Sequence, residues 1–170
     1  MSKAFTREEN EGPDLPDLPA LSSILPPGAK NYITRAGADR LREELRRLIE
    51  VERPRVAVES DDADAKRRLS ILDQRIFQLE QSLRSAEVVS PETAPADKVA
   101  FGATVTVRRE GGDESIYRIV GVDETDFDRG WVSWLSPIAR ALINAKLGQR
   151  VRFKFPSGEE ELEIISIRYQ

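Results

Sequence analysis

The amino-acid sequence predicts an α+β protein, in which an N-terminal antiparallel coiled-coil helical hairpin precedes a small antiparallel sheet with one short helix. Two observations predict the hairpin. Apolar residues recur at alternating spacings of three and four over residues 69–86, and residues 41–56 carry a shorter stripe of the same kind. A third observation predicts the sheet, because the apolar period changes to two beyond residue 98.

The first helix is expected over residues 36–58, with Thr34 as its N-cap. Pro54 lies inside this helix and should bend it or loosen one turn, because proline has no N–H and crowds the preceding carbonyl groups. The residues expected to face the second helix are Leu41, Leu45, Leu48, Ile49 and Val56.

The second helix carries a seam of apolar residues with charged or polar residues between them. The link around Ser60 is too short for a crossover, so the two helices should run antiparallel. Ser60 is expected to cap the second helix, which places Asp61 and Asp62 in a first turn where the helix dipole favours negative charge. The seam consists of Leu69, Leu72, Ile76, Leu79, Leu83 and Ala86.

Residues 99–170 alternate apolar and polar side chains in several short runs separated by turn residues. Strands are expected near 99–107, 115–122, 131–135, 151–155 and 160–169, with an acidic loop at 123–128. Ser136 and Pro137 have the residue types of an N-cap and a first helical position, and Gly148 is expected to end that helix. The Ile164-Ile165 doublet breaks the alternation of the last strand and indicates a bulge or two covered faces.

The composition excludes several kinds of chemistry. The chain of 170 residues has no cysteine and no histidine, which excludes disulfides, thiol nucleophiles, zinc sites and imidazole bases. The net charge of −4 argues against bulk nucleic-acid binding. No apolar run reaches membrane-spanning length and no signal-peptide core is present, so we expect a cytoplasmic protein without a membrane partner.

Four segments are expected along the chain. Residues 1–30 are acidic and proline-rich and should form a disordered arm, either a solubilising tail or a docking peptide. Residues 31–89 form the hairpin, residues 90–98 a proline-bearing linker, and residues 99–170 the C-terminal domain.

The hairpin carries many basic residues, but they are interleaved with acidic ones. Residues 31–90 contain twelve residues of each sign. Two interpretations remain open, namely a solvated face of ion pairs and a basic track beside a phosphate backbone. The residues considered for the track are Arg46, Arg53, Arg55, Arg67 and Arg68.

Several motifs resemble the bacterial transcription elongation factors GreA and GreB. The run Ser-Pro-Ile-Ala-Arg-Ala-Leu at 136–142, followed by Leu147-Gly148 and a strand, resembles their C-terminal domain, as do Phe101-Gly102 and residues 117–121. Residues 31–34 and 51–54 look GreB-like, and residues 66–69 with Asp73 look like the start of that family's descending helix. The resemblance covers about residues 30–170 in order.

This resemblance implies a hairpin joined to an FK506-binding-protein-like domain that docks at the secondary channel of RNA polymerase. The residues implied for docking are Ser136, Pro137 and Arg140. The hairpin would enter the channel, where Asp61, Asp62 and Asp64 are the candidate catalytic acids. They would share Mg²⁺ with the polymerase active site rather than bind a metal of their own, and the basic residues would guide the 3′ end of the nascent RNA. We expect a monomer that is not itself an enzyme.

The tip departs from the family pattern. Roughly a dozen residues are absent between Val56 and Lys66, which shortens the hairpin by about 10 Å. Leu135 stands where the family usually has Asp or Asn. We therefore expect a regulator that binds polymerase with weak or no stimulation of transcript cleavage. The alternatives are an active GreB-type cleavage factor that works through the tip acids, and an Rnk-like interaction module that acts otherwise.

Overall fold

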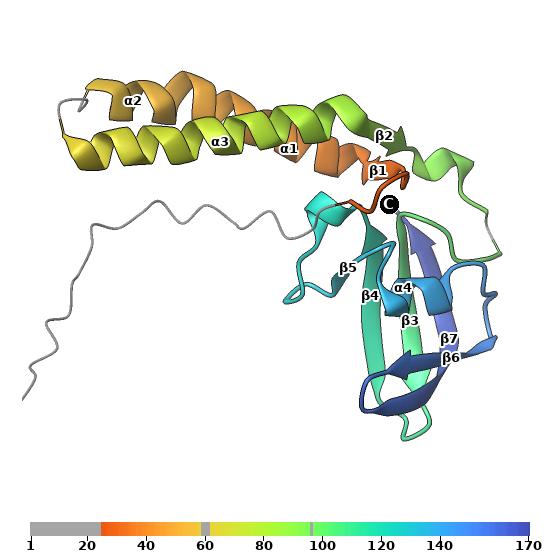
Figure 1. The fold of residues 1–170 in the computed structure, drawn as a ribbon. Coiled ribbons are helices and arrows are strands. Elements are labelled where there is room, and N and C mark those ends of the chain that lie inside the picture. The colour runs from red at the N-terminus through yellow and green to blue at the C-terminus, as the bar shows by residue number, and fades with distance from the viewer. Residues whose placement is uncertain (1–24, 59–61, 96) are drawn as a thin grey trace, which may run out of the picture.

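The computed structural model describes residues 25–58, 62–95 and 97–170. Figure 1 shows two long helical arms lying across one end of a curled sheet. The mixed architecture confirms the predicted α+β class.

The first arm contains α1 (Arg35–Arg47), a π-helical turn (Leu48–Glu52) and α2 (Arg53–Val58). Thr34 is the N-cap of α1, as predicted, and its hydroxyl accepts a hydrogen bond from the Gly37 amide at 3.0 Å. The widened turn directly precedes Pro54, because proline cannot donate to the carbonyl four residues earlier. Ile49 lies in this turn and is 43% exposed, so it was wrongly assigned to the apolar stripe.

The second arm is α3 (Ala63–Ser85), and Asp62 caps it in place of the predicted Ser60. The Asp62 carboxylate accepts from the Asp64 amide at 3.3 Å, while Ser60 and Asp61 lie outside the described residues. The two arms lie side by side in Figure 1. They pack through an apolar core. Each fully buried leucine there contributes about 1.5–3 kcal/mol relative to exposure. The buried members are Ile33, Ala38, Leu41, Leu48, Leu72 and Leu79.

A short parallel ribbon closes the base of the arms. β1 (Asn31–Thr34) pairs with β2 (Ala86–Val89), with Asn31 opposite Ala86 and Thr34 opposite Val89. The Asn31 side-chain amide also donates to the Ser82 carbonyl oxygen at 3.1 Å and to Ser85 Oγ at 3.0 Å. This pairing is not predicted from the sequence, because four residues at a helix end carry no period-two signal.

The sheet has the strand order β5-β4-β3-β7-β6. Its strands are β3 (Ala103–Arg109), β4 (Glu114–Val120), β5 (Trp131–Ser133), β6 (Arg150–Phe155) and β7 (Gly158–Tyr169). The pairing of β4 with β5 is parallel, which corrects the prediction of a wholly antiparallel sheet. A register shift opposes Thr106 to Ser166 and Val107 to Ile164, so the predicted bulge is present at Ile165.

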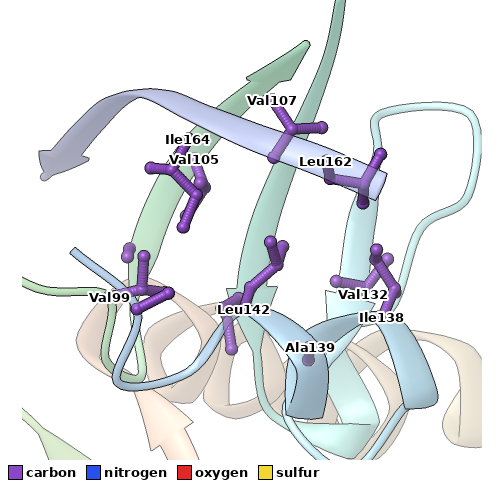
Figure 2. Close-up of a cluster of buried hydrophobic side chains, with 12 residues drawn as sticks. Val99, Val105, Val107, Val132, Ile138, Ala139, Leu142, Leu162 and Ile164 are labelled. Carbon is purple, nitrogen blue, oxygen red and sulfur yellow. The ribbon is translucent and has the colours of Figure 1, made fainter. Parts of the chain in front are cut away.

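The helix α4 (Pro137–Leu142) packs on one face of this sheet. Figure 2 shows Ile138, Ala139 and Leu142 directed toward valine and isoleucine side chains of the strands. The helix ends at Leu142 rather than at Gly148. Gly148 instead occupies a turn before β6 with φ +80°, a conformation that glycine adopts without strain.

Tyr169 at the end of β7 provides a test of this core at alkaline pH. Its hydroxyl donates to the Lys98 carbonyl oxygen at 2.7 Å and accepts from the Ala100 amide at 3.0 Å. Burial raises the pKa of Tyr169, with the Ala100 hydrogen bond opposing the shift. The stabilisation is therefore complete below the unfolded-state pKa of about 10 and is lost as pH rises through the higher folded-state pKa.

We expect Tyr169→Phe to cost about 1–2 kcal/mol of unfolding free energy at neutral pH. The difference between variant and parent should shrink as pH passes the folded-state pKa, because the phenolate can no longer donate to Lys98. Urea unfolding across this range measures the difference. A difference that stays constant with pH would contradict the assigned donor role of the hydroxyl.

Candidate functional site

The tip of the helical arms carries the predicted acids. Asp62 and Asp64 are exposed at the start of α3, and Asp61 lies outside the described residues. Asp62 acts as the N-cap and Asp64 occupies the first turn, where the helix dipole favours its charge. Both acids thus have a structural role besides any catalytic one.

The tip acids were considered as ligands of a shared Mg²⁺. Within the ranges that the structure covers, no group of three or more metal-ligating side chains is assembled. Asp62 and Asp64 present two exposed carboxylates, and Mg²⁺ is commonly held by one or two carboxylates together with substrate phosphates and water. Two such carboxylates fit an Mg²⁺ ion whose other ligands come from elsewhere.

The predicted docking residues lie at the start of α4. Ser136 Oγ accepts from the Ala139 amide at 3.3 Å, and Pro137 takes the first helical position, as predicted. The preceding loop is held by Ser133, whose Oγ accepts from the Leu135 amide at 3.1 Å. Since Ile138, Ala139 and Leu142 are anchored in the core, the exposed Pro137 and Arg140 are presented from a rigid support (Figure 2).

Four of the five shaft residues considered for an RNA track are exposed. Arg46 contacts Glu43 at 2.6 Å and Glu50 at 3.2 Å, and the hydrogen bond from Arg46 lowers the pKa of Glu43.

The other exposed shaft arginines include two with acidic neighbours. Arg53 on the first arm forms an ion pair with Asp73 on the second arm at 2.7 Å, and Arg55 is 3.9 Å from Glu52. Arg67 is also exposed, whereas Arg68 is half-buried. Arg46, Arg53 and Arg55 therefore belong to a surface of ion pairs.

Arg75, one of the basic residues of the second helix, is buried between the arms. Its side chain is 7% exposed, and its Nε and Nη2 donate to Glu44 Oε1 at 2.8 and 2.6 Å. The position falls within the apolar seam of α3, so the guanidinium group packs in the arm interface instead of facing solvent. Arg75 is consequently a structural residue of the arms.

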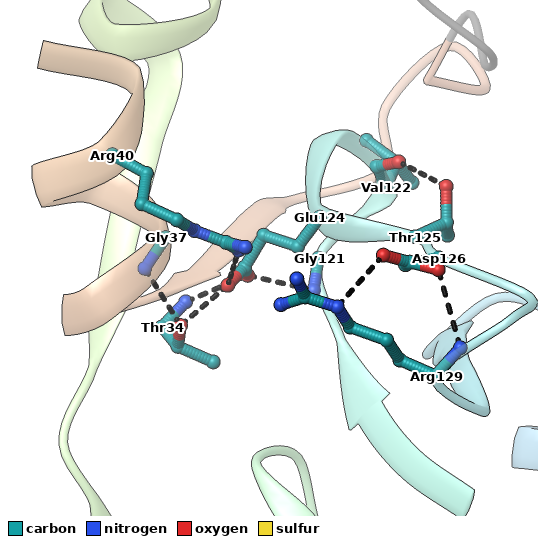
Figure 3. Close-up of polar contacts among 9 residues, drawn as sticks. All are labelled: Thr34, Gly37, Arg40, Gly121, Val122, Glu124, Thr125, Asp126 and Arg129. Atoms are coloured by element: carbon teal, nitrogen blue, oxygen red, sulfur yellow. Dashed lines mark hydrogen bonds and ion pairs between the residues drawn. The ribbon is translucent and has the colours of Figure 1, made fainter. Parts of the chain in front are cut away.

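Glu124 joins the arms to the sheet and was missed by the sequence analysis, which placed it in an acidic loop. It lies in a short 3₁₀ turn (Val122–Glu124), and its side chain is 1% exposed. Oε2 accepts from the amides of Thr34 and Gly121, each at 2.9 Å, while Oε1 accepts from the Thr34 hydroxyl. Arg40 lies 3.7 Å from Oε1 (Figure 3). One carboxylate thus ties the start of α1 to the end of β4.

We call this set of contacts, made by Glu124 with Thr34 and Gly121, the joint. It also requires two glycines. A Cβ on Gly37 would lie 2.0 Å from Glu124 Oε1, and a Cβ on Gly121 would lie 2.3 Å from the Tyr32 carbonyl oxygen. On the other arm, Ser82 Oγ donates to the Asp123 carboxylate. The two arms are therefore fixed to the same turn of the sheet domain.

Comparison with known proteins assigns the chain to a family. Residues 94–169 match the family described as "Transcription elongation factor, GreA/GreB, C-term". The curated "Transcription elongation factor GreB" of Neisseria meningitidis is 42% identical, with 82% of this chain and 94% of that protein aligned. The chain belongs to the GreA/GreB family. The curated "Transcription elongation factor GreA" of Alkalilimnicola ehrlichii is 43% identical over 83% of this chain and 99% of that protein.

In the alignment with the Neisseria GreB, this chain lacks residues at some positions that the relative has. It spans 154 positions but only 82% of the 170 residues, which is about 139 residues, so about 15 positions face a gap. A solved GreA/GreB structure from Nitrosomonas europaea is 26% identical, with 82% of this chain and 100% of that chain aligned and a TM-score of 0.41.

Across the described part of the chain, no helix is both long and apolar enough to span a membrane.

Proposed function

We propose that this GreA/GreB family member binds RNA polymerase and regulates elongation, with weak or no stimulation of transcript cleavage. The sheet domain would dock at the rim of the secondary channel through Ser136, Pro137 and Arg140, and the arms would enter the channel. The chain is not an enzyme in this proposal. Any Mg²⁺ belongs to the polymerase active site.

One observation carries the proposal, namely short arms combined with a rigid docking loop, by which we mean residues 133–140. The docking loop has a capped helix, an exposed proline and a core-anchored support. By contrast, α3 has 23 residues and is about 35 Å long at 1.5 Å per residue. The gap of about 15 positions against the Neisseria GreB agrees in size with the missing tip residues that the sequence indicates.

The length of the arms decides whether the tip acids can take part in cleavage as well as in binding. Metal ligation requires oxygen atoms to be placed within a few tenths of an ångström. Arms about 10 Å shorter than those of the family would leave Asp61, Asp62 and Asp64 short of the metal ions. The same arms would still occupy the channel, so steric and electrostatic effects on elongation would remain.

Binding is tested with variants of the docking loop. Arg140→Glu and Pro137→Glu should each weaken binding to core RNA polymerase by about tenfold or more, because both side chains are exposed on a rigid support. Arg108→Glu is a matched control, since Arg108 is exposed and lies beside the turn between β3 and β4. Surface binding measurements give the dissociation constants. Unchanged affinity for both loop variants, with normal melting temperatures, would contradict docking through this loop.

Cleavage is tested with stalled, backtracked transcription complexes that contain radiolabelled RNA. We expect the parent and the Asp61/Asp62/Asp64 triple alanine variant to release equally little short 3′ RNA. The alternative, an active cleavage factor, requires release by the parent and its loss in the triple variant. Asp62→Ser keeps the N-cap of α3 and so separates a loss of metal ligation from a loss of helix stability.

An Rnk-like interaction module remains the second alternative. It differs from the main proposal in the role of the arms, which would not need to enter the channel. A chain truncated within the arms but still active on polymerase would favour this alternative.

A further inference from the structure

A cleft of about 390 Å³ lies between the base of the arms and the end of the sheet. The arm side of its wall includes Arg35 and Asp39 of α1, together with Val89 and Pro91. The sheet side includes Phe101 and Arg118. This volume lies in the range that binds small ligands or a few side chains of a peptide.

Arg118 on β4 indicates what kind of group the cleft binds. Its guanidinium group lies 5.0 Å from the centroid of the Trp131 ring, where Arg40 and Arg129 also lie, at 4.8 and 5.4 Å. Arg40 and Arg129 have acidic neighbours, Glu124 at 3.7 Å and Asp126 at 3.3 Å.

Arg118 has no such neighbour. It forms no ion pair with any residue that the structure describes, and its buried Nε has no hydrogen-bond acceptor among them. A buried guanidinium N–H without an acceptor is unfavourable. A carboxylate in the cleft would supply the counter-charge that the Arg118 guanidinium group lacks among the described residues.

A second arginine lies on the same face of the sheet. Thr104 on β3 is paired with Arg118 on one side and with Arg168 of β7 on the other. Two strand spacings separate the two arginines, so their Cα atoms are about 10 Å apart. Arg168 is exposed, contacts Ser166 Oγ at 3.4 Å, and has no acidic partner in the described ranges. Arg118 lines the cleft, and Arg168 lies beside it, two residues before Gln170 of the cleft wall. The two side chains therefore place two positive charges on this face of the sheet.

The N-terminal segment of the sequence contains carboxylates at that spacing. Residues 13–21 read Pro-Asp-Leu, Pro-Asp-Leu, Pro-Ala-Leu, and they lie outside the described residues. In a polyproline II helix, three residues make one turn with a rise of about 3.1 Å each. Asp14 and Asp17 would then lie on one edge about 9 Å apart. The leucines Leu15, Leu18 and Leu21 would form another edge.

We propose that residues 13–21 bind the cleft of their own chain as a polyproline II helix. Asp14 and Asp17 would pair with Arg118 and Arg168, and the leucine edge would pack against Phe101, Val89 and Pro91. Aromatic-lined grooves commonly bind this conformation, because it is extended and loses little entropy on binding.

The geometry of the chain permits this contact. Nine residues lie between Leu21 and Asn31 at the start of β1, enough to span roughly 30 Å. Thr34 at the end of β1 already lines the cleft. Two acids line the cleft, Asp39 and Glu92. Asp39 is paired with Arg42 at 2.8 Å, and no ion pair joins Glu92 to Arg118 in the described residues. The bound segment would hold the arms and the sheet together at the joint.

The absence of cysteine allows a direct test on the full chain. A nitroxide attached to Gly12→Cys should broaden the NMR signals of the Gly102 amide and the Trp131 indole N–H. Gly112 is the internal reference, because it lies in the turn at the opposite end of β3. Asp14→Asn/Asp17→Asn should restore the Gly102 signal. Glu8→Gln/Glu9→Gln removes the same charge outside the repeats and should leave the broadening in place.

Arg168→Gln tests the receiving side and should also restore the Gly102 signal, because the side chain is exposed and its loss should not unfold the chain. Arg108→Gln, an exposed residue near the far end of β3, is its control. Equal broadening in the parent and in Asp14→Asn/Asp17→Asn would overturn the proposal. Broadening that rises with protein concentration would overturn binding within one chain. It would indicate that residues 13–21 bind the cleft of a second copy.

Discussion

Replacing Glu124 with alanine is expected to lower the free energy of unfolding by about 3–5 kcal/mol. The substitution leaves the amides of Thr34 and Gly121 and the Thr34 hydroxyl without their acceptor, in a place that excludes water. It also removes the acid beside Arg40, whose guanidinium group already lies against Trp131. Urea unfolding followed by circular dichroism measures the loss.

Two further variants separate the charge of Glu124 from its shape. Glu124→Gln keeps the volume but replaces one accepting oxygen with an NH₂ group, which should give an intermediate loss. Gly37→Ala keeps the carboxylate and forces a Cβ to within 2.0 Å of it, so the joint should open although no polar group was removed. Asp126→Ala is the control, because Asp126 forms a partly exposed ion pair with Arg129 and its loss should cost about 1 kcal/mol.

The joint also matters for the proposed function. Arms that are free to pivot on the sheet domain would enter a channel less often, because their direction would no longer be fixed when the domain docks. Glu124→Ala should therefore weaken polymerase binding, even though Glu124 lies apart from Pro137 and Arg140 in the sequence. Equal affinity of Glu124→Ala and the parent would show that the joint contributes stability alone.

The sequence predicted those parts of the fold that repeat along the chain. The leucine seam located both arms, and the period-two alternation located four of the five strands closely. Local capping residues correctly placed the caps Thr34 and Ser136. The break in alternation at Ile164-Ile165 indicated a bulge or two covered faces, and the structure has the bulge. Each of these features depends on neighbours in the sequence, which the residue pattern records.

The errors lie where tertiary contacts decide the role of a residue. In the sequence, Glu124 and Arg75 look like ordinary charged surface residues. Only the folded chain shows that each is buried against a partner. Asp62 rather than Ser60 caps α3, because several adjacent residues have side chains that can cap a helix and the residue pattern alone places a helix end only to within one or two residues. The β1–β2 pair forms because the antiparallel arms bring the segments before α1 and after α3 together.

The second large effect is expected at the buried ion pair between the arms. Glu44→Ala should lower the free energy of unfolding by about 2–4 kcal/mol, because it leaves the Arg75 guanidinium group buried without a counter-charge. The Glu44 side chain is 22% exposed, which places the expected loss below that of a fully enclosed pair. Thermal and urea unfolding of the variant measure it.

Arg53 and Asp73 provide a matched control on the same interface. They also join the two arms, at 2.7 Å, but each side chain is 50% exposed, so Asp73→Ala should cost no more than about 1 kcal/mol. The double variant Glu44→Leu/Arg75→Met removes both buried charges and fills the space with apolar atoms. Its stability should return to about the parent value, because neither charge then has to be removed from water. A double variant as unstable as Glu44→Ala would mean that the arms depend on the ion pair itself rather than on the packing around it.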